Sequence, residues 1–185
     1  KRMNELINDL LEYARAGADG DMFAEVETET VVLETLAQLD AVITDRQAEI
    51  KFDHLPVINA QKTGMQILLR NLISNAIKYQ IQGNKPLVTI SCTDKKSHWQ
   101  FLIEDNGIGI DAQHLEKVFN RFYQVPESGA QLGGSGIGLA FTKNIVELHN
   151  GTISVVSAPG KGAEFTIKMP IQQTGGKQSG LTEDN

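Results

Sequence analysis

The sequence is short of several things, and each shortage excludes a class of protein. It contains one cysteine, Cys92, so it can form neither an internal disulfide nor a metal site built from several cysteines. The 17 basic residues are outnumbered by 23 acidic ones, and the net charge is −6. Because phosphate backbones select basic patches, we expect no nucleic acid among the partners. No apolar run approaches the roughly 20 residues of a membrane-spanning helix, and no signal peptide is evident.

With 185 residues, the chain is long enough for one domain with short appendages. It begins at Lys1 rather than at Met, so we expect a fragment of a longer protein. Apolar residues recur at helical spacing from Met3 to Ala14, which predicts a helix over residues 1–16 that ends at the glycines of 17–20. Two interpretations stay open: the end of a longer helix, or an amphipathic arm packed on its own domain.

Hydrophobic periodicity predicts the elements that follow. One helix has Val32, Leu36, Leu39 and Ile43 on a single face. The strongest helical pattern starts at Met65, from which apolar residues recur at steps of 3, 4, 7, 8, 11 and 12. Extended segments are predicted at 50–53, 56–58, 87–92, 98–104, 152–156 and 163–169, and helices at 111–119, N-capped by Asp111, and at 136–149, ended by Asn150 and a left-handed Gly151.

The order of these elements predicts the fold class. Strands occur mainly in hairpins with helices between them, so the sheet should be mixed and largely antiparallel, with helices covering one face. We therefore expect an α+β fold, a two-layer α/β sandwich. Residues 171–185 are polar and contain glycine, and we expect a flexible tail there.

Three polar residues share one face of the strongest helix. Asn71, Asn75 and Lys78 are spaced by four and three residues, and their face borders the apolar stripe rather than opposing it. Amide oxygens can bind a hard cation, and an ammonium group can bind phosphate. A solvated face is the alternative, but asparagine is a poor helix former, and two on one face make that alternative weaker.

The segment 104–110 follows a strand directly and contains Asp105, Gly107 and Gly109. A buried carboxylate at a strand end needs a donor, and the exocyclic amine of a base is one. The two glycines would let a flat ligand approach the backbone closely. By itself, however, this motif is more typical of a turn that ends a strand.

The segment 133–139 opens a helix with several glycines. Backbone N–H groups at such a helix start can bind an anion, assisted by the helix dipole. No Lys-Ser/Thr pair follows, which excludes a Walker loop, and no βαβ unit surrounds it, which excludes a Rossmann fingerprint. A flexible hinge remains the alternative. In order along the chain, the three motifs describe a nucleotide site.

Taken together, the motifs resemble those of the catalytic ATP-binding domain of sensor histidine kinases, which has the Bergerat-type ATPase/kinase fold. Residues 71–79 are similar to the N box of that family, 105–109 to its first glycine box, 119–123 to its F box and 134–139 to its second glycine box. The resemblance implies four segments: the end of the dimerisation and phosphotransfer helix (1–17), a linker (18–24), the catalytic ATP-binding domain (25–170) and the flexible tail (171–185).

The resemblance also implies roles for individual residues. Asn75 would bind the Mg²⁺ that bridges the ATP phosphates, and Asn71 would support that site. Lys78 would contact phosphate, Tyr79 would line the pocket, and Asp105 would accept from the adenine amino group. A mobile ATP lid over about 119–134 would be anchored by Phe119 and Phe122. The other implied nucleotide-binding positions are Gly107, Gly109, Ile110, Phe122, Gly134, Ser135, Gly136, Gly138 and Leu139.

Two departures from the family pattern matter. None of the four histidines, at 54, 98, 114 and 149, lies in the family's His-Glu/Asp-x-Arg phosphoacceptor motif, so we interpret all four as structural or surface residues. The chain should then bind ATP without phosphorylating itself. Many members also have a basic residue directly after the F-box aromatics, where this sequence has Gln124, so Arg121 becomes the candidate lid cation.

Other functions of the same fold are less compatible with the sequence. The related ATP hydrolases place a water-activating Glu one turn before the Mg²⁺-binding Asn, and here that position is Asn71, whose amide cannot act as a general base. A non-catalytic, nucleotide-gated interaction module remains the main alternative to the kinase, and a serine-kinase anti-sigma factor a weaker one.

For a kinase, the resemblance implies ATP or ADP with Mg²⁺ as ligands, and a phosphoacceptor helical hairpin and a response regulator receiver domain as partners. It further implies a cytoplasmic domain and a homodimeric parent protein. Whether that parent is a membrane-bound sensor stays open at this point.

Overall fold

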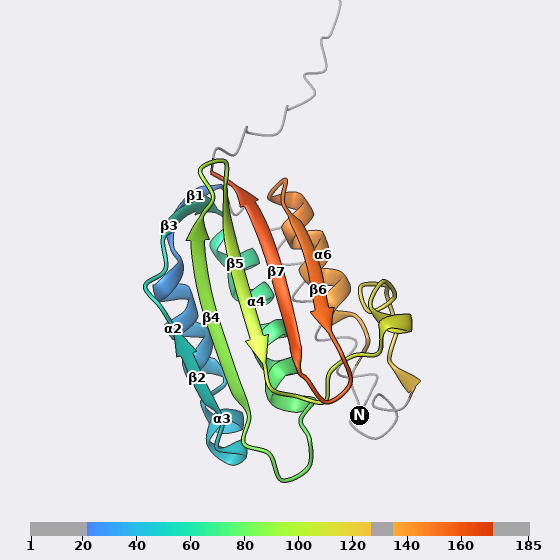
Figure 1. Ribbon diagram of the computed structural model, residues 1–185. Helices are drawn as coiled ribbons and strands as arrows, with labels where there is room; N and C mark the ends of the chain where they lie inside the picture. Colours follow the sequence, from blue (N-terminus) through green and yellow to red (C-terminus); the bar gives the residue numbers. More distant parts are fainter. Residues whose placement is uncertain (1–21, 127–134, 172–185) are drawn as a thin grey trace, which may run out of the picture.

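A five-stranded sheet with helices on one face forms the body of the molecule (Figure 1). The computed structural model describes residues 22–126 and 135–171. The edge strand β2 runs parallel to its neighbour β4, and every other neighbouring pair in this sheet is antiparallel. This confirms the predicted α+β class and the mixed, largely antiparallel sheet. In spatial order the strands are β2 (Glu49–Phe52), β4 (Leu87–Asp94), β5 (His98–Asp105), β7 (Ala163–Pro170) and β6 (Thr152–Ser157).

The core lies between this sheet and its helices. The central helix, α4 (Lys62–Lys78), buries the predicted apolar stripe, and Leu68, Leu72 and Ile73 are each at most 1% exposed. Ile90 of β4 is paired with Ile103 of β5, and both side chains are buried. The helices on this face are α2 (Thr28–Gln38), α3 (Asp40–Arg46), α4 and α6 (Gly138–Leu148). In the described part of the chain, no helix is long and apolar enough to cross a membrane.

A second, two-stranded sheet was not predicted. Strand β1 (Ala24–Glu27) pairs antiparallel with β3 (Val57–Ala60), the segment that the sequence predicted as an extended connection. Ala24, which falls in the predicted linker, is the first residue of β1. The strand is four residues long and buries only Val26, so its sequence pattern is too short to be recognised.

Three predictions about helices were wrong. The single helix predicted from Val32, Leu36, Leu39 and Ile43 is two helices, because the chain turns at Leu39, whose ψ is 2°. The helix at 111–119 is only a 3₁₀ turn, η1 (Ala112–His114), although Asp111 does cap it by accepting from the Gln113 N–H at 3.0 Å. The left-handed residue after α6 is Asn150, with φ 54°, rather than Gly151.

Helices α4 and α6 are antiparallel and are joined by a side chain at two places. At the first, His149 accepts from the Gln61 backbone N–H through Nε2 (3.0 Å), so its Nδ1 carries the proton and donates to the Ile145 carbonyl (2.7 Å). At the second, the Asn71 amide Nδ2 donates to the Gly138 carbonyl at 3.2 Å. His149 is fully buried, and burial lowers its pKa below the usual value.

Some predictions concern residues outside the described part of the chain. These are the helix over 1–16, the segment 127–134 of the expected lid with its Gly134, and the tail beyond Ile171.

Candidate nucleotide-binding site

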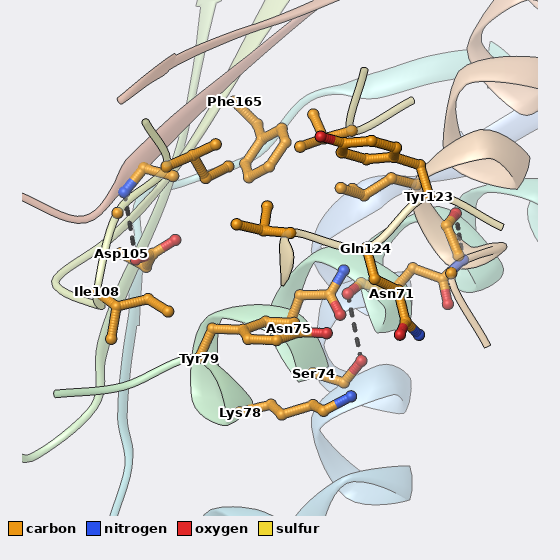
Figure 2. Close-up of a pocket in the computed structure, with 18 of the residues that line it drawn as sticks. Asn71, Ser74, Asn75, Lys78, Tyr79, Asp105, Ile108, Tyr123, Gln124 and Phe165 are labelled. Atoms are coloured by element: carbon orange, nitrogen blue, oxygen red, sulfur yellow. Dashed lines mark hydrogen bonds between the residues drawn. The ribbon is translucent and has the colours of Figure 1, made fainter. Parts of the chain in front are cut away.

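A pocket of about 420 Å³ opens between the C-terminal half of α4, the loop after β5 and the start of α6. Figure 2 shows Asp105 and Ile108 on one side of it, Tyr123 and Gln124 on the other, and the residues of α4 between them. The volume lies in the range of small-molecule sites. The pocket therefore brings together two segments that the sequence separates by about thirty residues, the loop after β5 and the segment before α6.

Asp105 forms the polar centre of one end of the pocket. Its Oδ1 atom accepts from two backbone N–H groups, those of Gly107 (2.8 Å) and Ala163 (3.2 Å). Burial raises the pKa of this carboxyl group, and the two N–H donors oppose the rise. Since both donors bind the same oxygen, the second oxygen is available to a ligand, and Figure 2 shows it on the pocket side.

The loop that carries Asp105 is fastened to the turn between β6 and β7. The N–H groups of Gly160 and Gly162 donate to the carbonyls of Ile108 (2.7 Å) and Gly107 (3.0 Å), respectively. Ser157 adds a side-chain link, since its Oγ accepts from the Ile110 N–H at 2.8 Å and donates to the Gly162 carbonyl. At Gly162, which has φ +71°, a Cβ atom would overlap the carbonyl group of Asp105, so only glycine fits there.

The opposite end of the pocket is lined by one face of α4. Asn71, Ser74, Asn75 and Lys78 all line it, as their helical spacing requires. The Ser74 hydroxyl donates to the Asn71 carbonyl at 3.2 Å. The Lys78 ammonium lies 4.8 Å from the centre of the Tyr79 ring, which holds a cation against the aromatic wall of the pocket.

The start of α6 closes this end. Ser135, Gly136, Gly138 and Leu139 line the pocket, where the first N–H groups of a helix favour an anion. Gly136 has φ +73°, and a Cβ atom on it would lie 2.9–3.1 Å from the backbone of Phe122 and Tyr123. Its carbonyl accepts from the Phe122 N–H at 2.9 Å. The contact between Phe122 and Gly136 thus holds together the two segments that flank residues 127–134.

The aromatic F-box residues occupy different environments. Phe119 packs edge-on against Phe165, with ring centres 6.4 Å apart, and Phe165 lines the pocket. The Phe122 side chain is 68% exposed and lies outside the pocket, with its backbone in the left-handed region at φ 64°. Arg121 is also exposed and outside the pocket. Phe122 and Arg121 therefore lie outside the pocket, and their expected roles at the nucleotide stay predictions.

Most of the sequence-predicted site residues come together in the pocket. Gly107, Phe122 and Arg121 do not line it, and Gly134 is not described. Of the residues that sequence reasoning missed, Ser74 had a signal, because it is one turn from Asn71 and Lys78. Ile108, Tyr123 and Gln124 lie in or directly after the recognised motifs 105–109 and 119–123, but no place in the pocket was predicted for them. The rest had no local signal, because they come from irregular segments or from β7. The missed residues are Ser74, Ile108, Val118, Tyr123, Gln124, Val125, Ala163 and Phe165.

The side chains that line the pocket limit which metal ion it could bind. Among the described residues, no group of three or more His, Cys, Asp or Glu side chains could hold a metal ion. Asn75 offers a single amide oxygen on the same helical face as Lys78. Mg²⁺ commonly takes one or two protein ligands and completes its shell with water and substrate phosphates, so this donor set fits Mg²⁺ bound together with a phosphate ligand.

The fold and the pocket define a nucleotide-binding ATPase-type domain. The chain belongs to the histidine kinase-, DNA gyrase B- and HSP90-like ATPase family, whose sequence pattern matches residues 60–173. Within that family, it is homologous to the ATP-binding domains of sensor histidine kinases, as the sequence motifs predicted.

Relatives in sequence cover almost the whole chain. The adaptive-response sensory kinase SasA of Prochlorococcus marinus is 33% identical over 96% of this chain and 50% of its own length. Cyanobacterial phytochrome A of Nostoc sp. is 35% identical over 91% of this chain and 22% of its own length, and the sensor protein SrrB of Staphylococcus aureus is 36% identical over 92% and 30%. The chain thus spans about a fifth to a half of the length of these relatives.

Solved structures share the fold. Full-length ShkA in complex with AMPPNP matches with a TM-score of 0.73 and 25% identity, over 91% of this chain and 35% of that one. The histidine kinase AdeS of Acinetobacter baumannii matches with a TM-score of 0.71 and 23% identity, over 91% of this chain and 78% of that one.

Proposed function

We propose that the pocket binds ATP together with Mg²⁺ and presents the γ-phosphate to a histidine that lies outside this chain, from which it passes to an aspartate of a response regulator. The observation that carries the proposal is the difference in chemical groups between the two ends of the pocket. One end has a partly buried carboxylate with an oxygen available to a ligand, and the other has two amides, an ammonium group and a helix N-terminus.

The base would bind at the Asp105 end. A carboxylate accepts a hydrogen bond from the amino group of adenine but repels the carbonyl oxygen that guanine has at the same position. Ile108, Ile110 and Phe165 supply apolar surface around this end. The two backbone N–H groups on Oδ1 keep the carboxylate in place whether or not a base is bound.

The phosphates would lie between α4 and the start of α6. Lys78 and the helix N-terminus attract negative charge there, and Asn75 would hold Mg²⁺, which supplies further neutralisation of the phosphate oxygens. Asp105, at the base end, is the only carboxylate or histidine among the described residues that line the pocket. Within the described ranges, the phosphate end therefore offers no general base to activate water, which favours transfer to an imidazole over hydrolysis.

The phosphoacceptor would come from a separate helical hairpin. All four histidines lie in the described part of the chain: His149 is buried, His54 is exposed near Glu29, and His98 and His114 are partly buried in β5 and η1. None of the four lines the pocket. The relatives named as sensor proteins or kinases are longer than this chain. We propose that the parent of this chain is likewise longer, that it is a homodimer and that it carries the hairpin.

Isothermal titration calorimetry with ATP and Mg²⁺ tests the nucleotide site. Asp105→Asn keeps an acceptor for Gly107 and Ala163 and should lower ATP affinity tenfold or more, about 1.4 kcal/mol, while GTP binding is lowered less. Asn75→Ala should lower ATP affinity by a similar factor with Mg²⁺ present and by much less in EDTA. Unchanged ATP affinity in both variants would refute the site.

Transfer needs a separate test. The chain joined to a dimerisation hairpin with its histidine should incorporate labelled phosphate from ATP that is lost in acid and retained in base. Incorporation that survives acid, or none, would contradict kinase activity while leaving nucleotide binding intact, as a nucleotide-gated interaction module requires.

A further inference from the structure

A hydrogen bond between His114 and Tyr123 lies beside the pocket and has no part in the function proposed above. His114 Nδ1 and the Tyr123 hydroxyl are 2.6 Å apart, and the ring centres are 6.0 Å apart with a tilt of 48°. Both side chains are partly buried, and Tyr123 lines the pocket (Figure 2). A phenol hydroxyl both donates and accepts, so this bond can form with either tautomer of the imidazole and with its protonated form.

His114 organises this wall of the pocket with its backbone as well. Its carbonyl accepts from the Val118 N–H at 3.0 Å, and Val118 is buried and lines the pocket. One residue thus holds two elements of the wall, Val118 through its carbonyl and Tyr123 through its ring. His114 itself lies at the end of η1, directly after the loop that carries Asp105 and that Ser157 fastens to β6.

Tyr123 belongs to the other side of the pocket. The preceding residue, Phe122, donates its N–H to the Gly136 carbonyl, and a Cβ on Gly136 would lie 3.0 Å from the Tyr123 carbonyl. Gly136 is two residues before α6, whose N-terminus faces the proposed phosphate position. The His114–Tyr123 bond therefore closes a continuous path from the base end of the pocket to its phosphate end.

We propose that His114 is a positioning residue that acts through Tyr123. It ties the Asp105 loop and η1, at the base end of the pocket, to residues 122–125 and Gly136, at the phosphate end. The inference rests on the proposed ATP site and adds a coupling within it. The Asp105 loop and η1 are already held in place, and the bond extends that order to 122–125 and Gly136, where the phosphates need them. Without the bond, the base still binds, but the phosphates add less affinity.

The test compares ligands with and without phosphates. Calorimetry with adenosine and with ATP and Mg²⁺ gives the phosphate increment, the ratio of the two dissociation constants. Tyr123→Phe and His114→Ala should each shrink this increment about fivefold, the effect of losing one partly buried hydrogen bond, while adenosine affinity changes less than twofold. The double variant should be no worse than either single one, because both changes remove the same bond.

Two controls separate positioning from mere stabilisation. His114→Asn keeps a polar group near the position of Nδ1 and should restore most of the increment, whereas His54→Ala removes an exposed histidine far from the pocket and should leave it unchanged. Equal losses for adenosine and ATP, or additive effects of the two single changes, would overturn the coupling. A wild-type chain that binds no ATP would overturn both the coupling and the proposed function, and normal wild-type binding with an unchanged increment would overturn the coupling alone.

Discussion

Each of the two junctions between α4 and α6 is a hydrogen bond from a side chain of one helix region to the backbone of the other. One junction is buried, and the other lies at the pocket wall. At one, His149 is fully buried and both ring nitrogens are bonded to backbone groups. At the other, Asn71 bonds the first residue of α6 and also lines the pocket. A polar group that is satisfied and sealed stabilises the fold, whereas one at a cavity wall can also serve a ligand. The comparison predicts that stability and binding depend on different ends of the same helix pair.

The largest expected effect is at the sealed junction. His149→Ala removes a buried ring and leaves the Gln61 N–H without its acceptor, which should lower the free energy of unfolding by about 3 kcal/mol. Urea denaturation without nucleotide measures it. His54→Ala, whose side chain is 93% exposed, is the matched control and should stay within about 0.5 kcal/mol of the wild type. Equal losses in the two variants would show that the sealed junction adds no stability of its own.

A smaller effect is expected at the pocket junction. Asn71→Ala should cost about 1 kcal/mol of stability, because the Gly138 carbonyl still accepts from the Thr142 hydroxyl at 3.0 Å. Asn71→Asp should bind ATP more weakly than Asn71→Ala, since it sets a negative charge beside the proposed phosphate position. Denaturation and calorimetry on both variants check this. If Asn71→Asp bound ATP as well as Asn71→Ala does, the phosphates would have to lie elsewhere.

The smallest effect is a pH dependence of stability, which should have opposite signs for His149 in the sealed junction and for Asp105 in the pocket. His149 has a lowered pKa in the folded chain, so its contribution to stability is present above about 6.5, the unfolded value, and is lost as the pH falls below it. Asp105 has a raised pKa, so its contribution is present below the unfolded value and is lost as the pH rises through the folded one.

Stability measured against pH in two variants separates these contributions. His149→Gln cannot titrate, and it should lose less stability than the wild type between pH 6.5 and 5. Asp105→Asn should lack the decline that accompanies ionisation of the carboxyl group as the pH rises. Parallel pH profiles for the wild type and both variants would show that neither group is linked to folding.

How far the sequence predicts this molecule depends on whether a feature is local. Helical spacing decides which side chains share a face, so Asn71, Asn75 and Lys78 reach one pocket as predicted. Ala163 reaches Asp105 only because β5 and β7 pair in the observed register, across 58 residues. No local pattern encodes that register, and the same holds for Ser157, whose contact with the Ile110 N–H depends on the packing of two loops.

The β6–β7 connection, residues 158–162, looks like a place where foreign sequence is tolerated, since residues 158–161 are exposed and contain proline and glycine. Yet this turn holds the back of the Asp105 loop through Gly160, Gly162 and Ser157. The length of this turn is therefore constrained by its hydrogen bonds to the Asp105 loop as well as by the pairing of the two strands. A tag or loop graft inserted there should leave the sheet intact and still weaken the proposed binding of the base at Asp105, although residues 158–162 do not line the pocket.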